Sequence, residues 1–240
     1  MWLVLAAAWA GAQNALAGGG TFVTLPALLL AGLDPLAANV TSAVALFPSQ
    51  VVSGWASRRM VAGPPGLSAP RLLAIAAVGG LLGAVLLLAT PVSIFTQLIP
   101  WLVLFATAVF AWGSYGPRPA AAPRPRPALA AGLQGLIALY GGYFGGGIGF
   151  LILAVLSSAG VPIRSAGATK NALAAVINAG AVLIFVLSPA VQWGPAALVC
   201  VGSVLGGVAG SWALRRAPER WLRAGVVVLG LLLTAGLMAR

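Results

Sequence analysis

Two stretches of this chain share one pattern, GGGTFVTLPALLLAGLDPLAANVTS at residues 18–42 and GGGIGFLILAVLSSAGVPIRSAGATKNA at residues 145–172. In each stretch three glycines interrupt an apolar run and precede a short apolar segment that ends in another glycine. A threonine follows that glycine nine residues later in both, at Thr41 and Thr169. The spacing indicates an internal duplication of about 128 residues. Paired, glycine-interrupted apolar segments in corresponding halves are typical of the substrate site of a membrane transporter.

The composition of the 240 residues indicates a protein that lies in a lipid bilayer. Hydrophobic residues make up 61% of the chain and charged residues 6%, and the mean hydropathy is +1.05. Soluble domains carry roughly 25% charged residues, so this composition excludes a water-soluble fold. A membrane-spanning helix needs about 20 apolar residues, and charge-free runs at 72–117, 127–163 and 171–214 are long enough to hold such helices. The fold class predicted is an all-α polytopic membrane protein.

The ten apolar segments divide into two sets of five. A stretch rich in proline and arginine, GPRPAAAPRPRP, separates the sets. We therefore expect a first membrane repeat at 1–116, a cytoplasmic linker at 117–127 and a second repeat at 128–240. The segments lie at about 1–17, 21–32, 38–57, 71–89, 93–113, 128–144, 148–160, 166–188, 194–214 and 221–239.

Basic residues predict the orientation, because cytoplasmic loops of membrane proteins are enriched in Lys and Arg. Arg58, Arg59 and Arg71 place the loop after the third segment inside, and the linker arginines place the linker inside. The two segments of each glycine-broken hairpin are short and must return to the side from which they start. Each half then holds one hairpin and three crossings, an odd number, so the halves have opposite orientation. Inverted repeats with both termini outside are the predicted architecture.

The glycines themselves are the first candidates for a binding site: Gly18, Gly19 and Gly20 in one half and Gly145, Gly146 and Gly147 in the other. Irregular backbone at membrane depth is tolerated only where it is buried in protein or lines an aqueous cavity. Helices that begin directly after the glycines present free N–H groups and a positive dipole end, which attract anions. The alternative is that the glycines only permit close helix packing.

Polar residues on the following helices are the second set of candidates: Thr41, Ser42, Ser49, Gln50, Thr169, Lys170, Asn171 and Asn178. Polar side chains in apolar helices face the interior of the bundle or a water-filled path. For the hydroxyls the alternative is a helix–helix hydrogen bond of about 0.6 kcal/mol. Lys170 either contacts a substrate anion or extends its ammonium to the membrane surface.

Other classes of function find little support in the residues. The chain has no histidine and only two acidic residues, so it predicts neither a metal site nor an intramembrane proton relay, and no cofactor is expected. Asp34 precedes Pro35, as a residue that caps a helix would. The GGGIG sequence lacks the lysine of a phosphate-binding loop. No catalytic motif is present, so we do not expect an enzyme, and no basic-aromatic stripe suits nucleic acid.

The paired glycine motif, with Pro26 and the Thr41–Ser42 pair, resembles the TauE/SafE family of sulfite exporters over nearly the whole chain. The resemblance implies a multi-pass permease of a bacterial inner membrane. It also implies a substrate among small sulfur-containing or organic anions such as sulfite, sulfonates and sulfoacetate. Leu153 stands near the position of Pro26 in the second half, so the two hairpins are not assumed to be equivalent.

The sequence therefore predicts an exporter of small anions that binds its substrate between the two glycine triplets and works by alternating access. An anion channel and a non-transporting membrane scaffold are the alternatives. The predicted partners are the anion and the lipid bilayer, and a homo-oligomer is left open.

Overall fold

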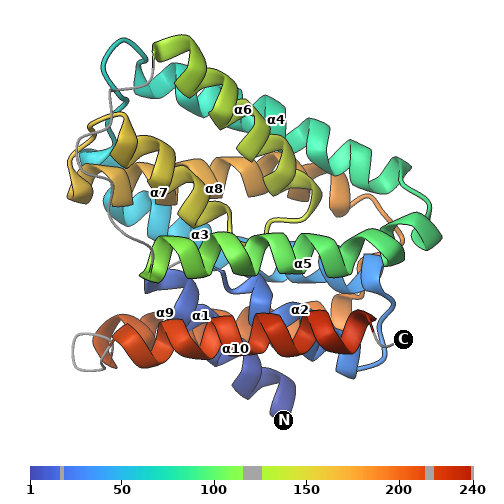
Figure 1. Ribbon diagram of the computed structural model, residues 1–240. Helices are drawn as coiled ribbons and strands as arrows, with labels where there is room; N and C mark the ends of the chain where they lie inside the picture. Colours follow the sequence, from blue (N-terminus) through green and yellow to red (C-terminus); the bar gives the residue numbers. More distant parts are fainter. Residues whose placement is uncertain (17–18, 116–125, 214–218, 239–240) are drawn as a thin grey trace.

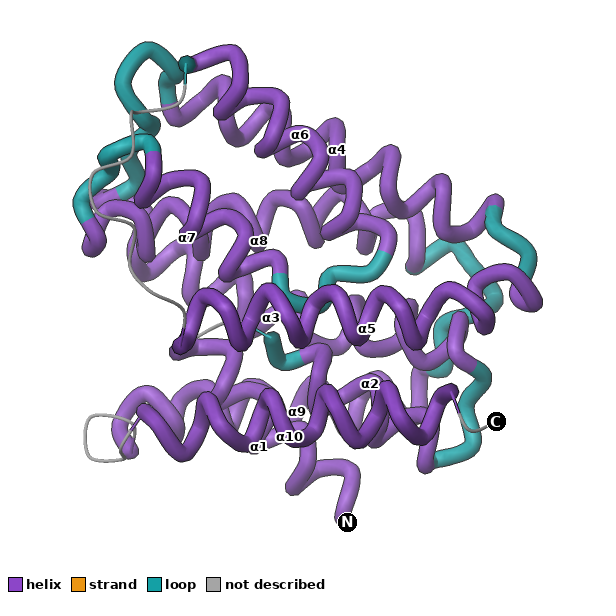
Figure 2. The backbone as a smooth tube through the Cα atoms, viewed as in Figure 1, coloured by secondary structure: helices purple, strands orange, loops and turns teal. Residues whose placement is uncertain are grey.

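The protein consists of helices throughout the residues that its computed structural model describes, 1–16, 19–115, 126–213 and 219–238. All ten predicted segments are helices whose ends lie within three residues of the expected positions. The elements, drawn in Figures 1 and 2, are α1 (Trp2–Leu16), α2 (Thr21–Leu30), α3 (Pro35–Ser57), the short 3₁₀ helix η1 (Arg58–Met60), α4 (Ala69–Ala89), α5 (Val92–Tyr115), α6 (Pro127–Tyr143), α7 (Ile148–Ser158), α8 (Ile163–Phe185), α9 (Trp193–Ala213) and α10 (Glu219–Met238).

The two short helices end in the same kind of turn. Gly32 and Gly160 follow α2 and α7 with φ of 93° and 82°, a conformation that glycine adopts without strain. In both turns the next residue donates its N–H to a carbonyl five residues back, Leu33 to Leu28 and Val161 to Leu156. The chain then enters α3 and α8. The repeated local sequence therefore produces a repeated local structure.

Asp34 begins α3 as predicted. Its Oδ1 accepts the N–H of Ala37 at 3.0 Å, and Pro35 occupies the first helical position. Pro is favoured there because its missing N–H would have no partner within the helix.

Glycines bring two pairs of helices into backbone contact. A Cβ atom at Gly83 of α4 would overlap the carbonyl oxygen of Leu139 on α6, and one at Gly206 of α9 would overlap that of Ala8 on α1. These are the glycines whose four-residue spacing with Gly79 and Gly202 recurs in the two halves. Close approach through small residues is the packing mode of membrane helices. The α4–α6 pair of the structure thus has a counterpart in the α9–α1 pair.

The remaining helix contacts follow the same correspondence. Helix α3 packs on α8, and α5 packs on α10. Helix α4 contacts α8 as α9 contacts α3, and α2 contacts α10 as α7 contacts α5. In Figure 1, α3 and α8 run in opposite directions across the middle of the molecule, and α6 and α7 form a bent hairpin. Exchanging the first five helices for the last five reproduces these contacts.

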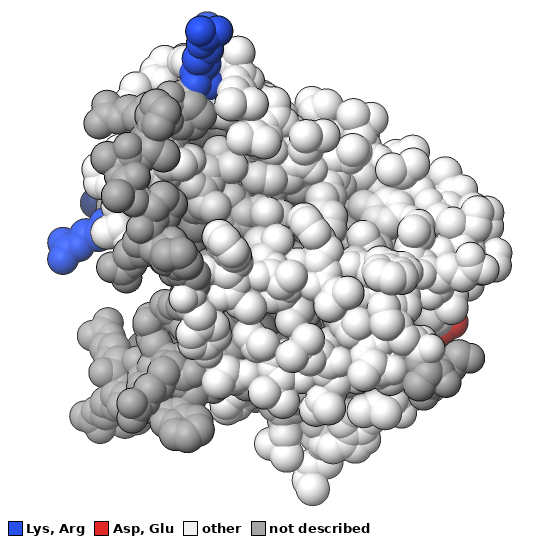
Figure 3. Space-filling model, in the orientation of Figure 1, with Lys and Arg blue, Asp and Glu red and all other residues white. Residues whose placement is uncertain are grey.

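Basic and acidic side chains lie at opposite ends of the face drawn in Figure 3. In Figure 3 the visible Lys and Arg atoms lie at one end, and the visible acidic atoms lie at the opposite end. At the basic end the Arg58 guanidinium stacks on the Trp55 ring at 4.1 Å from its centroid and donates a hydrogen bond to the Trp55 carbonyl. The face between the two ends is largely uncharged. This distribution is typical of a bundle with one cytoplasmic surface.

Four of the described helical spans are long and apolar enough to cross a membrane: Pro35–Met60, Ala69–Ala89, Val92–Val109 and Ile163–Phe185. Large apolar side chains such as Leu86, Trp101 and Leu187 point outward and are half-exposed or more. Lipid would cover these side chains. The chain is therefore a multi-pass helical membrane protein.

Three parts of the chain lie partly or wholly outside the described residues. Gly18 lies there, and so does most of the linker predicted at 117–127, although its last residue, Pro127, begins α6. The connection before α10, with Arg215 and Arg216, also lies there.

Candidate functional site

A pocket lies where the two glycine breaks meet the middle helices. It has a volume of about 30 Å³. Each probe-sized water needs roughly 10–15 Å³ of such space, so the pocket holds about two water-sized groups. The lining residues come from α1, both breaks, α2, α3, α7 and α8: Asn14, Gly19, Thr21, Gln50, Ser53, Gly145, Ile148, Gly149, Lys170, Asn171 and Ala174.

The first break contributes its glycine backbone and two polar side chains. Gly19 has φ of 95°, and the chain turns there from α1 into α2. Asn14, near the end of α1, and Thr21, at the start of α2, both line the pocket. Gln13 lies behind this wall: a Cβ on Gly19 would be 3.8 Å from its Nε2. The Gln13 amide is 1% exposed and has no hydrogen-bond partner within the described residues.

The second break is held by a tyrosine. The Tyr140 hydroxyl of α6 donates to the Gly146 carbonyl at 3.0 Å, and Gly147 precedes α7 with φ of 76°. Ile148 and Gly149 begin α7 and line the pocket. No hydrogen bond within the described residues occupies their N–H groups. The positive end of the α7 dipole therefore lies at the pocket.

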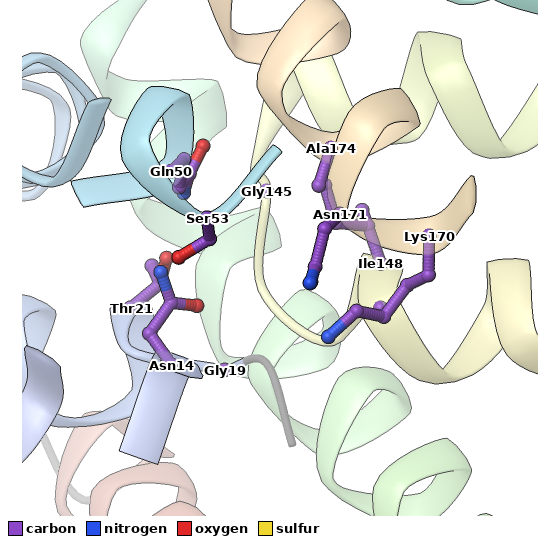
Figure 4. A pocket seen from close by; sticks show the side chains of 11 residues that line it. Asn14, Gly19, Thr21, Gln50, Ser53, Gly145, Ile148, Lys170, Asn171 and Ala174 are labelled. Carbon is purple, nitrogen blue, oxygen red and sulfur yellow. The ribbon is translucent and has the colours of Figure 1, made fainter. Parts of the chain in front are cut away.

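Lys170 contributes the positive charge of the site. Its side chain is 5% exposed, and no hydrogen bond or ion pair joins it to any residue that the structure describes. Figure 4 shows the Lys170 and Asn171 side chains extending from α8 towards the space that Asn14 faces from the other side. A lysine buried among membrane helices is costly unless it is hydrated or paired with an anion. The side chain is buried and lines the pocket.

Helix α3 supplies the wall opposite α8. Gln50 and Ser53 lie one turn apart on α3 and face the pocket. The Ser53 hydroxyl donates to the Ser49 carbonyl of its own helix at 2.9 Å, whereas the Gln50 Oε1 has no partner within the described residues. The pocket is thus rich in neutral hydrogen-bonding groups around one ammonium. Such an arrangement can replace water around a small anion.

Several predicted residues lie outside this pocket and hold the fold together. Thr41 Oγ1 accepts the Gln192 N–H at 3.0 Å, and Thr169 Oγ1 accepts the Ala62 N–H at 2.9 Å. Ser42 is fully buried and shares a hydrogen bond with the Thr24 hydroxyl. These three hydroxyls form hydrogen bonds within the protein and do not line the pocket.

Ser49 and Asn178 bond the backbone of their own helices and do not line the pocket. Gly20, Gly146 and Gly147 belong to the breaks but not to the pocket lining. Of the predicted residues, the pocket brings together Gly19, Gln50, Gly145, Lys170 and Asn171.

Asn14, Thr21 and Ser53 were not among the residues predicted from the sequence. Asn14 had a usable signal, because Gln13 and Asn14 are adjacent polar residues in an otherwise apolar helix, just before the first triplet. Thr21 directly follows that triplet. Ser53 had no such signal, because it resembles the other serines of α3.

No group of three or more His, Cys, Asp or Glu side chains that could hold a metal ion is found among the described residues. The polar groups of the pocket are amides, hydroxyls, backbone N–H groups and one ammonium. This donor set suits an anion.

Fold and site together define the class: a multi-pass helical membrane protein with a small, positively charged pocket at two helix breaks. Residues 3–237 match the model of the sulfite exporter TauE/SafE family, and the chain belongs to this family. The resemblance inferred from the glycine motifs is thereby confirmed.

Curated relatives cover nearly the whole chain. The "Probable membrane transporter protein YfcA" of Escherichia coli is 29% identical over 98% of this chain and 88% of its own length. The "Probable membrane transporter protein ORF9" of a Sinorhizobium species is 30% identical over 99% of this chain and 91% of its own length. A "Probable membrane transporter protein" of Haemophilus influenzae is 26% identical over 92% and 88%. No solved structure matches the chain.

Proposed function

We propose that this protein is an exporter of small anions, with sulfite, sulfonates and related oxyanions as its substrates. The observation that carries the proposal is the Lys170 ammonium, which is buried in a pocket formed by both glycine breaks and has no partner among the described residues. The family to which the chain belongs and the relatives named as membrane transporters support a transport function. A buried cation without a protein counter-charge in a membrane protein marks a place where an anion binds.

In this proposal the substrate oxygens accept hydrogen bonds from the amide groups of Asn14 and Asn171 and from the free N–H groups at the start of α7. Lys170 offsets the charge. Gly19 and Gly145, one from each triplet, place their backbone at the anion. Thr41, Ser42, Ser49, Thr169 and Asn178 enter the site only in a second arrangement of the helices, because their present hydrogen bonds turn them away from it.

We also propose that the two halves are inverted repeats and that transport proceeds by alternating access. Three observations support this: the exchange of helix contacts between halves, the opposite directions of α3 and α8 in Figure 1, and the similar turns after α2 and α7. Inverted repeats allow one half to rock against the other around a fixed site. The membrane is the bacterial inner membrane, and both termini lie outside.

The pocket lies towards the basic end of the molecule. Lys170 follows Thr169, which bonds Ala62 just beyond η1 with its two arginines. Gln50 and Ser53 belong to the half of α3 that ends at η1. If the basic end is cytoplasmic, this arrangement loads substrate from inside, as an exporter requires.

The test is transport by purified protein in proteoliposomes, with sulfite, methanesulfonate and acetate offered separately. We expect saturable movement of at least one of these anions, and loss of most of it in Lys170→Ala. Gly167→Ala is the matched control on α8, because a Cβ there meets open space.

Equal transport by Lys170→Ala and the unchanged protein would refute the site. Unitary current steps without saturation would indicate a channel, and absence of movement with all three anions would indicate a scaffold.

A further inference from the structure

The charge of the pocket is set by Lys170 alone. Its ammonium is the one cationic group among the lining residues, and none of them is acidic. Asp34 is the acidic residue whose side chain the structure describes. It caps the N-terminal end of α3 and accepts the Ala37 N–H, whereas the pocket lies near the C-terminal end of that helix. The protein therefore brings no described counter-charge to this ammonium.

From this geometry we infer that Lys170 moves through the transport cycle only when paired with one monovalent anion, so that the protein exchanges one anion for another. The inference rests on the proposed transport function and specifies its substrate class and its coupling. The pair is neutral when the pocket is loaded, and the pocket carries an uncompensated positive charge when it is empty.

The energetic argument concerns the occluded state that alternating access requires. While the pocket is open, water solvates the ammonium. When the pocket closes, the ammonium loses that water, and an unpaired charge deep in a membrane protein is expensive. Asn14, Gln50 and Asn171 donate or accept hydrogen bonds but supply no negative charge. Closure of the empty pocket is therefore unfavourable, whereas closure of the pocket that holds an anion is not.

The position in the first half that corresponds to Lys170 adds no second cation. This position is Ser42, which is neutral, fully buried and bonded to Thr24. One ammonium balances one negative charge. A dianion would leave the closed pocket with a net negative charge, so monoanions such as a sulfonate are preferred to dianions such as sulfate.

The small volume of the pocket supports the same conclusion. A space of about 30 Å³, enough for about two water-sized groups, takes only part of a small oxyanion beside the ammonium and has no room for a second ion. The counter-charge must therefore be the bound ligand itself.

The experiment is methanesulfonate uptake into proteoliposomes that contain methanesulfonate, chloride or sulfate at equal ionic strength. We expect internal methanesulfonate to accelerate uptake about a hundredfold over internal sulfate, because closing an unpaired charge carries a penalty of that order. Exchange of monoanions is electroneutral, so the rate should not respond to an imposed membrane potential. Internal chloride distinguishes a requirement for any monoanion from a requirement for a sulfonate.

Two variants separate charge from fold. Lys170→Gln removes the charge, and we expect slower uptake that no longer depends on the internal anion. Lys170→Arg keeps the charge and should keep the dependence. Thermal unfolding in detergent gives a second readout: methanesulfonate should stabilise the unchanged protein and Lys170→Arg more than sulfate does, and should not stabilise Lys170→Gln.

Equal uptake with internal sulfate and internal methanesulfonate would overturn the inference while leaving the transport function intact. Uptake without an internal monoanion but with movement of protons would also overturn it, because the amine would then lose its proton instead of pairing. Absence of movement in every arm would overturn both this inference and the proposed function.

Discussion

The two central helices, α3 and α8, are alike at one residue and different at the next. Thr41 and Thr169 occupy equivalent positions, and each hydroxyl accepts a backbone N–H from the connection that follows the other central helix. Their neighbours diverge: Ser42 bonds Thr24, whereas Lys170 has no described partner and lines the pocket. The two halves thus agree at the residue that joins helices and differ at the residue that lines the pocket.

This difference explains why the pocket is not symmetric. The positions in α7 that correspond to Thr24 are Leu151 at the 127-residue spacing of the glycine triplets and Ile152 at the 128-residue spacing of the threonines, and both belong to an apolar cluster. The Lys170 side chain extends from α8 to the pocket that Gly19 and Gly145 of the two breaks line. The first half therefore has a hydrogen-bonded hydroxyl pair at this position, Ser42 with Thr24, and the second half has an ammonium that lines the pocket. The comparison is tested by four sets of substitutions, in order of decreasing effect.

The largest effect is expected where the halves match in packing. Gly83→Leu and Gly206→Leu each force a side chain into the backbone of the facing helix, because a Cβ already overlaps a carbonyl oxygen there. Such overpacking costs about 1–3 kcal/mol or more when the backbone must move. We expect little folded protein by size-exclusion chromatography in detergent.

Gly132→Leu is the control for these two substitutions, because Gly132 of α6 has open space around it. Normal yields of Gly83→Leu would contradict the close contact of α4 with α6.

The second effect concerns the matched threonines. Thr41→Val and Thr169→Val each leave a backbone N–H without its acceptor, and we expect a loss of about 1–2 kcal/mol in the free energy of unfolding. The two losses should be similar if the halves are equivalent here. Thermal or denaturant unfolding in detergent measures both.

Thr96→Val serves as the control for the threonine pair, because Thr96 is exposed and donates only to a carbonyl of its own helix. A large loss at one threonine and none at the other would break the proposed correspondence between α3 and α8.

The third effect sharpens the contrast at the pocket. Asn171→Ala removes an amide that faces the ammonium side of the pocket, and Asn14→Ala removes one from the opposite wall. We expect each to weaken anion affinity about tenfold, which corresponds to about 1.4 kcal/mol, with the unfolding transition unchanged. Concentration dependence of uptake in proteoliposomes measures the affinity. Unaltered affinity in both variants would remove the amides from the site.

The smallest effect is expected at Ser42. Ser42→Ala removes the hydrogen bond to Thr24, but the Thr24 hydroxyl keeps its bond to the Gly20 carbonyl at 3.1 Å. We expect a loss of about 0.6 kcal/mol in unfolding free energy and little change in transport. A loss of transport equal to that of the Lys170 variants would mean that Ser42 contacts the substrate in another state, and that the halves share the site more evenly.

Much of the fold follows from local sequence. Asp34 before Pro35 predicts the start of α3, and glycines at 32 and 160 end α2 and α7, because these residue types favour those backbone conformations. The glycine triplets predicted two helix breaks and the short helices that begin after them. The pocket, by contrast, was predicted only in part: Lys170 and Asn171 line it, whereas Thr41 and Asn178 do not.

The part that could not be predicted depends on which way a polar side chain turns on its helix. All the candidate residues are polar groups in apolar helices, and the sequence offers no means of telling a hydroxyl that bonds a distant loop from one that faces a cavity. Thr41 meets Gln192, 151 residues away, and Thr169 meets Ala62, 107 residues away. Contacts at such separations exist only once the helices have packed.

By itself the sequence determined that this chain is a helical membrane protein with a duplicated, glycine-broken hairpin, because hydropathy, proline and glycine act on the backbone locally. The tertiary structure decided which polar side chains form hydrogen bonds between segments and which have no described partner. The physical reason is that hydrogen-bond partners are the neighbours that helix packing brings within a few ångströms. It left the Lys170 ammonium without a described partner and satisfied the hydroxyl of its counterpart, Ser42.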